Sequence, residues 1–174
     1  VDMHAVIGDV LMILESKLKT ERVQIDLSLD AEHCWVQGDR TELSQVLVNI
    51  LLNAMEAMVE SSERRVNICM WNNPGGKLEL SVEDTGPGIP ERVLPQILEP
   101  FFTTKGKLGG GEDESTGLGL TISSRSVSRH GGRLAAKNAA AGGAIFEMEL
   151  PALPAPPPPG AREPSEPIRP PPPL

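Results

Sequence analysis

Two alternating segments around a tight turn restrict this chain to folds that contain an antiparallel sheet. The sequence Asn-Asn-Pro-Gly-Gly at residues 72–76 separates the segments, and apolar residues alternate with polar ones on both sides of it. Alternation with a period of two is typical of half-buried strands, and a Gly-rich turn between two such strands predicts a hairpin. The alternating apolar positions are Val66, Ile68, Met70, Leu78, Leu80 and Val82.

Helical and strand-like segments follow one another along the first 150 residues. Apolar residues recur with helical spacing at residues 2–18 and 41–59, and we expect two more helices at residues 91–98 and 118–129. Residues 23–29 alternate like a strand, and we expect two last strands at residues 133–137 and 144–150, joined by an Ala/Gly turn. Hairpins interleaved with helices favour a sheet that helices cover on one face. We therefore expect an α+β fold, a two-layer α/β sandwich with helices packed on one face of a mixed, mostly antiparallel sheet.

The composition changes at Pro151. Half of the 24 residues from Pro151 to Leu174 are proline, and such a segment lacks the apolar surface that a core needs. We expect residues 1–150 to form one domain and residues 151–174 a disordered Pro-rich tail, either a plain linker or a ligand for a proline-binding module. The chain starts at Val1 rather than Met, so we expect it to be a fragment of a longer protein.

Charge and cysteine usage exclude several classes of function. A net charge of −8 argues against nucleic-acid binding, which needs a basic surface. No apolar run approaches the ~18 residues of a membrane span, which predicts a cytoplasmic location and leaves an upstream membrane anchor open. Cys34 and Cys69 lack close metal-ligand spacing, and we expect buried free thiols in strands rather than a disulfide.

Four polar residues share one stripe of the predicted helix at 41–59. They are Glu42, Gln45, Asn49 and Asn53, and their spacing of three, four and four residues places them on one face. Asparagine is a weak helix former, so two of them among apolar residues favour a ligand-facing stripe over the alternative of a merely solvated one. Amide oxygens suit a hard cation such as Mg²⁺.

A carboxylate ends the second strand of the predicted hairpin. Asp84 continues the alternation of the apolar residues before it and should therefore point toward the core. A buried carboxylate is costly without a donor partner, and Gly86 and Gly88 would let a ligand approach the backbone closely. The exocyclic amine of adenine is one such donor, whereas an ordinary turn after the strand is the alternative.

A Gly-rich stretch precedes the last predicted helix. Residues 103–117 contain five glycines and end on Gly-Leu-Gly-Leu at 117–120. Backbone N–H groups, the N-terminus of the following helix, Lys105 and Lys107 together predict an anion-binding loop. A Walker A loop, with Gly-x-x-x-x-Gly-Lys before Ser or Thr, does not occur.

In their order, these segments resemble the motif boxes of the ATP-binding catalytic domain of bacterial two-component sensor histidine kinases. This domain belongs to an ATPase superfamily that also contains gyrases, heat-shock chaperones and MutL-type clamps. The resemblance covers essentially the whole predicted domain and implies its fold, including a mobile ATP lid. It rests on QVLVNILLNAMEAM (asparagine box), DTGPGIP (first glycine box), EPFFTTK (phenylalanine box), TGLGLTIS (second glycine box) and the tripeptide HGG at 130–132.

The resemblance implies a role for each matched residue. Asn53, together with Asn49, would coordinate Mg²⁺ on the ATP phosphates, and Asp84 would bind the adenine amine. Asn49 and Glu42 are the expected catalytic residues. The expected nucleotide contacts are Asn49, Asn53, Asp84, Gly86, Gly88, Ile89, Phe102, Thr104, Lys105, Thr116, Gly117, Leu118, Gly119 and Leu120.

One departure from the family pattern concerns the phosphate cation. Many members carry Lys or Arg three residues after the second Asn of the box, and this chain has Glu56 there. Lys105 then becomes the candidate cation. Phe101 and Phe102 would anchor the lid, which is expected to span residues 103–116.

The implied reaction is transfer of the ATP γ-phosphate to a histidine on an upstream dimerisation domain, for relay to a response regulator receiver domain. In the family the phosphoacceptor histidine precedes Glu or Asp, and none of His4, His33 and His130 does. The chain is therefore expected to be inactive without its phosphoacceptor domain. The longer protein is expected to be a homodimer, and this fragment a monomer.

Three other functions share the fold. Gyrase-, chaperone- and MutL-type ATPases carry a Glu one turn before the metal-binding Asn, where this chain has Asn49. A serine kinase acting as an anti-sigma factor is disfavoured by the Pro-Phe-Phe-Thr-Thr-Lys sequence. A degenerate nucleotide-sensing module is disfavoured by Asn53, Asp84 and the intact glycine boxes.

Overall fold

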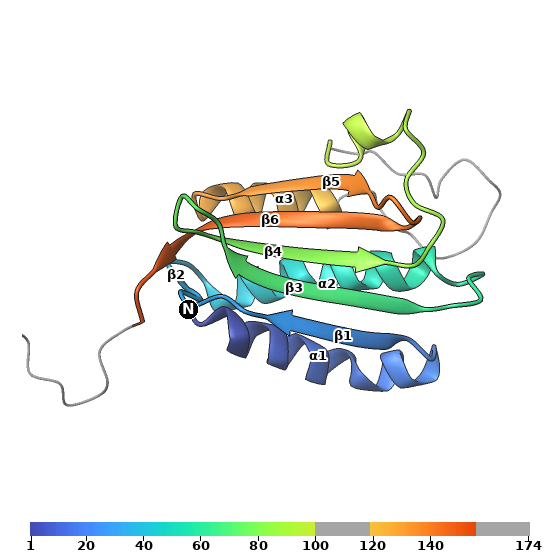
Figure 1. The fold of residues 1–174 in the computed structure, drawn as a ribbon, viewed down its shortest axis with the longest axis horizontal. Coiled ribbons are helices and arrows are strands. Elements are labelled where there is room, and N and C mark those ends of the chain that lie inside the picture. The colour runs from blue at the N-terminus through green and yellow to red at the C-terminus, as the bar shows by residue number, and fades with distance from the viewer. Residues whose placement is uncertain (100–118, 156–174) are drawn as a thin grey trace, which may run out of the picture.

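The computed structural model describes residues 1–99 and 119–155, which form one sheet with helices packed against it (Figure 1). The sheet has six strands in the order β1-β3-β4-β6-β2, and β5 also pairs with β6. The strands are β1 (Gln24–Leu29), β2 (Trp35–Val36), β3 (Arg65–Asn72), β4 (Lys77–Asp84), β5 (Arg133–Asn138) and β6 (Ala144–Leu153). The helices are α1 (Met3–Thr20), α2 (Arg40–Ala57), α3 (Gly119–Arg129) and the short 3-10 helix η1 (Leu94–Gln96).

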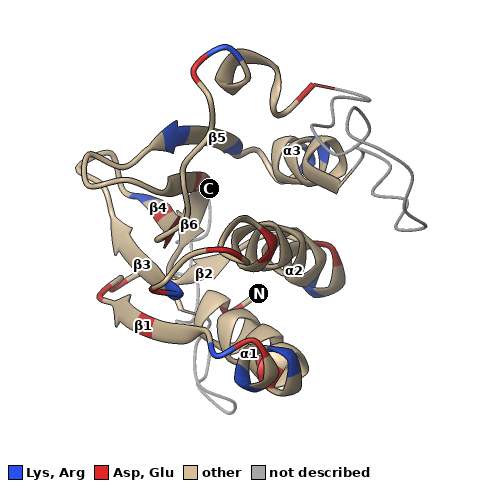
Figure 2. Cartoon of the chain, turned by 90° about the vertical axis from the view of Figure 1, so that its right-hand side faces the viewer, with Lys and Arg blue, Asp and Glu red and all other residues tan. Residues whose placement is uncertain are grey.

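The three long helices lie on the same face of the sheet, so the described residues form a layer of helices on a layer of strands (Figure 2). β1 runs parallel to β3, and every other strand pairing is antiparallel. The expected α+β class, with a mixed and mostly antiparallel sheet, is confirmed. The lid expected at residues 103–116 lies outside the described residues. Among the described helices, none is long and apolar enough to cross a membrane.

Helix α2 occupies the middle of the helical layer and contacts α1, α3 and β4. Because it has neighbours on several sides, most of its circumference must be apolar, which leaves only a narrow polar stripe. Its first turn is fixed by Asp39, whose side chain accepts a hydrogen bond from the Glu42 N–H at 3.0 Å. The fully buried side chains include Leu43, Ile50, Leu51, Met55, Ile68, Met70, Leu78 and Met148.

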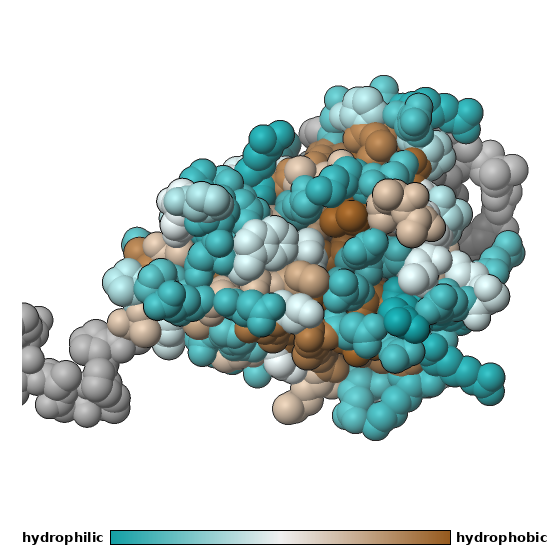
Figure 3. All heavy atoms as spheres, viewed as in Figure 1, coloured by the Kyte–Doolittle hydropathy of each residue, from teal (hydrophilic) through white to brown (hydrophobic). Residues whose placement is uncertain are grey.

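The opposite face of the sheet carries charged side chains. Lys77 on β4 pairs with Glu149 on β6 at 2.6 Å, and Lys137 on β5 pairs with Glu147 at 2.5 Å. Figure 3, which views this side of the molecule, shows mainly hydrophilic side chains with apolar ones between them. The alternation along the strands therefore separates a helix-covered core face from a polar outer face.

Three details differ from the sequence prediction. The helix expected at residues 91–98 is reduced to η1, because Pro95 within it has no N–H to donate. β2 was not expected, since two residues are too few to show alternation. Both cysteines are free, but they are half-buried rather than buried, and Cys34 lies just before β2 instead of within a strand.

Strand β6 also continues past the boundary that the composition suggested. Residues 151–153 belong to β6: Pro151 is paired with Lys77, Ala152 with Val36 and Leu153 with Trp35. Proline is tolerated near the end of a strand, where ladder hydrogen bonds run out. The first three residues of the segment expected as a tail are therefore part of the sheet, while residues 156–174 lie outside the described residues.

Two truncations are expected to differ in stability. Ending the chain after Ala155 should leave the melting temperature unchanged, because the removed sequence is Pro-rich and lacks core-forming residues. Ending it after Leu150 should reduce the free energy of unfolding by on the order of 1–2 kcal/mol, because the β2–β6 pairing is lost. Thermal denaturation of both proteins tests this. A large loss of stability in the longer truncated form would show that residues 156–174 dock on the domain.

Candidate functional site

Asp84 ends β4 on the helix-covered side of the sheet and is only 3% exposed. Its Oδ1 accepts hydrogen bonds from the N–H of Gly86 at 2.8 Å and from the N–H of Ala144 at 3.3 Å. Its Oδ2 accepts from no described residue. Burial raises the pKa of this carboxyl, against the opposing effect of the two backbone donors. One carboxylate oxygen thus has its donors, and the other is available to a ligand.

The turn between β5 and β6 brings the second donor to Asp84. Gly143 has a φ of +95°, and a Cβ placed on it would lie 1.8 Å from the Asp84 carbonyl oxygen. Only glycine permits this approach, which positions the Ala144 N–H on the carboxylate. Sequence analysis did not identify either residue. The adjacent pair Gly142-Gly143 was the available clue to a special turn.

The segment after Asp84 is held by Asn138 at the end of β5. Asn138 Oδ1 accepts from the N–H of Ile89 at 2.7 Å, and Asn138 Nδ2 donates to the Ile89 carbonyl at 2.7 Å. Gly88 has a φ of +78°, and a Cβ there would lie 2.9 Å from Asn138 Oδ1. Gly88 was expected to make room for a ligand. In the structure it makes room for the two hydrogen bonds between Asn138 and Ile89. Asn138 is a positioning residue that no motif in the chain pointed to.

Asn53 lies on α2, one turn before its C-terminus. Its Nδ2 donates to the carbonyl of Asn49 at 2.8 Å, and its Oδ1 accepts from no described residue. A Cβ on Gly86 would lie 3.3 Å from the carbonyl of Ala57, so the segment after Asp84 packs against this end of α2. The structure thus brings the segment after Asp84 to the same end of α2 as Asn53.

Asn49 contacts α3 through its amide. Its Oδ1 accepts from Gln45 at 3.0 Å, and its Nδ2 lies within hydrogen-bonding distance of the Gly119 carbonyl (3.3 Å) and Ser123 Oγ (3.2 Å). Other residues of this chain therefore bond both the oxygen and the nitrogen of the Asn49 amide. Asn49 fixes the first turn of α3, where the expected contacts Gly119 and Leu120 also lie.

Glu42 lies two helical turns before Asn49 and also faces α3. Ser126 Oγ donates to its Oε2 at 3.1 Å, and Arg129 Nη2 lies 2.8 Å from its Oε1. His130 of the HGG tripeptide adjoins this contact: its Nε2 accepts from the Asp39 N–H at 3.0 Å, and its Nδ1 donates to the Ser126 carbonyl at 2.7 Å. The polar stripe of α2 is therefore largely an α2–α3 contact rather than a solvated face.

A hollow of about 1220 Å³ opens beside Asp84 and Gly86. Its other lining residues include the carboxylates Glu56, Glu60, Glu63 and Glu83, which outnumber the one cation among the described residues of the lining, Arg65. Such a concentration of carboxylates repels an anionic ligand. The hollow therefore offers no place for a phosphate chain, although Asp84 lies at its margin.

Several expected contacts lie outside the described residues, so the structure does not place them. They are Phe102, Thr104, Lys105, Thr116, Gly117 and Leu118. The expected contacts that the structure does place are Asn49, Asn53, Asp84, Gly86, Gly88, Ile89, Gly119 and Leu120.

Residues 38–154 match the model of the family described as histidine kinase-, DNA gyrase B-, and HSP90-like ATPase. Sensor protein FixL of Bradyrhizobium diazoefficiens is 39% identical over 134 residues, which cover 77% of this chain and 25% of that protein. Signal transduction histidine-protein kinase AtoS of Escherichia coli is 33% identical over 154 residues, which cover 88% of this chain and 24% of that protein. The chain thus spans about a quarter of the length of these relatives.

Solved structures show the same fold. The catalytic domain of histidine kinase ThkA has a TM-score of 0.72 at 33% identity, covering 86% of this chain and 94% of that one. Full-length ShkA in complex with AMPPNP has a TM-score of 0.73 at 26% identity, covering 89% of this chain and 31% of that one. ThkA in complex with the response regulator protein TrrA has a TM-score of 0.70 at 29% identity, covering 88% of this chain and 41% of that one.

Proposed function

The chain belongs to the histidine kinase-, DNA gyrase B-, and HSP90-like ATPase family, and from this premise we propose that it transfers the γ-phosphate of Mg-ATP to a histidine. It is an ATP-binding catalytic domain of the histidine kinase type. The proposed acceptor lies on a dimerisation domain outside this chain, and a response regulator receives the phosphate next. The complex of ThkA with TrrA supports that second step. Since ATP is the substrate, we place the domain in the cytoplasm.

The observation that best supports the proposal concerns the Asp84 carboxylate, because only one of its two oxygens accepts hydrogen bonds from described residues. A buried carboxylate with two backbone donors on Oδ1 and no described donor on Oδ2 is suited to a ligand that donates. The exocyclic amine of adenine is such a donor, and Gly86 leaves room next to it. Asn138 and Gly143 hold the segments on either side of Asp84, so the adenine contact is preorganised.

Asn53 Oδ1 fits the magnesium ion that the family implies. It is an amide oxygen with no described donor, and the bond from Asn53 Nδ2 to the Asn49 carbonyl fixes its orientation. Bound Mg²⁺ would neutralise charge on the phosphates. We propose that Asn49, expected as a second ligand and a catalytic residue, instead holds α3, because its amide is already bonded to Gln45, Gly119 and Ser123.

Helix α3 supplies the phosphate side of the proposed site. Its N-terminus begins at Gly119, and unpaired N–H groups with the positive end of the helix dipole favour an anion there. Glu42 contributes indirectly: through Ser126 and Arg129 it fixes α3 relative to α2, so we assign it a positioning role.

Histidine transfer, rather than hydrolysis, is supported by the residue one turn before Asn53. A carboxylate there could accept a proton from water and start hydrolysis. Asn49 occupies that position, and its amide has no useful basicity at neutral pH. The γ-phosphate should therefore persist until the acceptor histidine arrives.

Reconstitution tests the proposal. The chain alone should bind Mg-ATP, turn it over slowly and remain unlabelled by γ-phosphate. Addition of a separately made dimerisation domain with a His-Glu or His-Asp sequence should produce a phosphorylated histidine that survives alkali and is lost in acid. The matched control replaces that acceptor histidine with glutamine. Hydrolysis by the chain alone at about one turnover per second or faster would instead establish a motor-like ATPase.

A further inference from the structure

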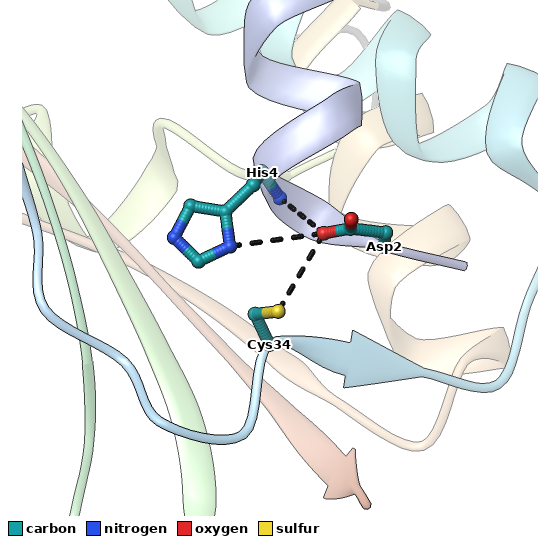
Figure 4. A group of neighbouring side chains, drawn as sticks. All are labelled: Asp2, His4 and Cys34. Atoms are coloured by element: carbon teal, nitrogen blue, oxygen red, sulfur yellow. Dashed lines mark hydrogen bonds and ion pairs between the residues drawn. The ribbon is translucent and has the colours of Figure 1, made fainter. Parts of the chain in front are cut away.

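Three side chains with metal-ligating atoms converge where α1 begins (Figure 4). Asp2 Oδ1 lies 3.5 Å from Cys34 Sγ and 3.7 Å from His4 Nδ1, and the three ligand atoms lie within 4.8 Å of one another. Among the described residues, no other three His, Cys, Asp or Glu side chains come this close. The group lies at the N-terminal end of α1 and in the loop before β2.

Two of the three spacings between these atoms are close to those of a tetrahedral site. With metal–ligand bonds of about 2.0–2.3 Å, the ligand atoms of a tetrahedral zinc site lie about 3.3–3.6 Å apart. The two measured distances from Asp2 Oδ1 are close to these values, so an ion could be bound with small side-chain rotations. Thiolate, imidazole and carboxylate are all ligands that Zn²⁺ accepts.

Backbone contacts hold the two segments together without any ion. The Met3 N–H donates to the Cys34 carbonyl at 3.0 Å, and Asp2 forms a bridge with Trp35. On the other side, Asn72 bonds both the N–H and the carbonyl of His33. The ligand atoms therefore come from a framework that is already fixed, which reduces the entropy lost on binding.

Both ring nitrogens of His4 lie near polar atoms of the chain. Its Nε2 lies 3.5 Å from the Leu29 carbonyl oxygen, and its Nδ1 lies 3.7 Å from Asp2 Oδ1. Metal-bound histidines commonly donate their other ring N–H to a carbonyl in this way. Asp2 Oδ1 also caps α1 by accepting from the backbone N–H of His4 at 2.9 Å, which keeps this oxygen next to the imidazole.

The site is open to solvent on one side. The side chains of Asp2 and His4 are 32% and 38% exposed, and Cys34 is half-buried. Burial, and next the negative charge of Asp2, raise the pKa of the Cys34 thiol, so the metal-free thiol is protonated and donates to Asp2. A bound divalent cation would reverse the effect of that charge.

We propose that Asp2, His4 and Cys34 bind one divalent transition-metal ion, Zn²⁺ by their chemistry, with water as the fourth ligand. On binding, the Cys34 thiol releases its proton to solvent, and a sulfur–metal bond replaces the S–H···O bond to Asp2. The ion links the start of α1 to the loop that precedes β2. The ion site and the proposed nucleotide site lie at opposite ends of the sheet. They are separate, because β4, which runs between these ends, is about 23 Å long.

Metal titration of the untagged chain tests the site. Co²⁺ should bind one per chain and give the thiolate-to-cobalt charge-transfer band and the intense visible bands of four-coordinate cobalt. Zn²⁺ should displace it and, at about 100-fold excess over its Kd, raise the melting temperature by about 5 °C or more. Cys34→Ser and His4→Ala should each remove the charge-transfer band or weaken binding at least tenfold.

Matched controls exist in the same chain. Cys69→Ser removes the other thiol and His33→Ala removes the neighbouring imidazole, and both should bind Co²⁺ like the unaltered chain. ATP affinity, measured on every variant, reports that the fold is retained, and Cys34→Ser keeps a donor to Asp2. Three results would each overturn the proposal. They are the absence of stoichiometric Co²⁺ binding by the unaltered chain, a charge-transfer band that persists in Cys34→Ser, and a loss of Co²⁺ binding in Cys69→Ser as large as that in Cys34→Ser.

Discussion

Replacing Asp84 by asparagine is expected to raise the Kd for Mg-ATP by about 10- to 150-fold. In the proposed site the carboxylate accepts a charge-assisted hydrogen bond from the adenine amine, and such a bond contributes on the order of 1.5–3 kcal/mol. Asparagine can still accept from Gly86 and Ala144 with its Oδ1, but its Nδ2 would then face the adenine amine, donor against donor. Calorimetric titration with ATP measures the loss.

The same substitution is expected to spare or raise the stability of the nucleotide-free domain at neutral pH. Burial raises the folded-state pKa of Asp84 above its unfolded value, so the stability that this group contributes is present at low pH and is lost as pH rises through the folded-state pKa. At neutral pH the raised pKa of Asp84 is therefore a net cost to stability, which Asp84→Asn removes. The advantage of the variant should shrink as pH falls from the folded-state pKa toward the unfolded pKa of about 3.9, and it should be absent below that value.

Nucleotide choice provides the control for this prediction. The unaltered chain should prefer ATP to GTP, because the six-position oxygen of guanine presents an acceptor to the Asp84 carboxylate. Asp84→Asn should narrow or reverse that preference. Equal affinity of the unaltered chain for both nucleotides would contradict the proposed role of Asp84.

Replacing Asn53 by alanine is expected to remove most of the Mg²⁺-dependent share of ATP affinity. A residue that only supports a metal ligand contributes about 10- to 100-fold to metal affinity, and a direct ligand should contribute at least as much. Alanine is a strong helix former, so α2 should remain intact. ATP titrations with Mg²⁺ and with a chelator measure the difference, which should be large in the unaltered chain and small in the variant.

Asn49→Ala separates metal binding from the positioning of α3. It removes the bonds from Asn49 to Gly119 and Ser123, so we expect a lower melting temperature with the Mg²⁺ dependence of ATP affinity retained. If Asn49→Ala instead abolishes that dependence, Asn49 is a metal ligand after all. If Asn53→Ala leaves the Mg²⁺ dependence of ATP affinity unchanged, other residues bind the ion.

Local periodicity was sufficient to predict the fold class and the orientation of two residues of the proposed site. Alternation along the β3–β4 hairpin placed Asp84 on the core side, and helical spacing placed Asn53 on the polar stripe of α2. Both patterns depend on geometry within one element, where side-chain direction follows directly from residue spacing. The acidic net charge and the Pro-rich composition after residue 155 were likewise evident from the chain itself.

Tertiary structure alone decided which distant residues complete the site. Ala144 reaches Asp84 across 60 residues of sequence, Asn138 reaches Ile89 across 49, and Asn49 reaches Ser123 across 74. The continuation of β6 to Leu153 and the meeting of Cys34 with Asp2 arise in the same way. Contacts between elements depend on how the layers pack, and no pattern within a single element encodes that packing.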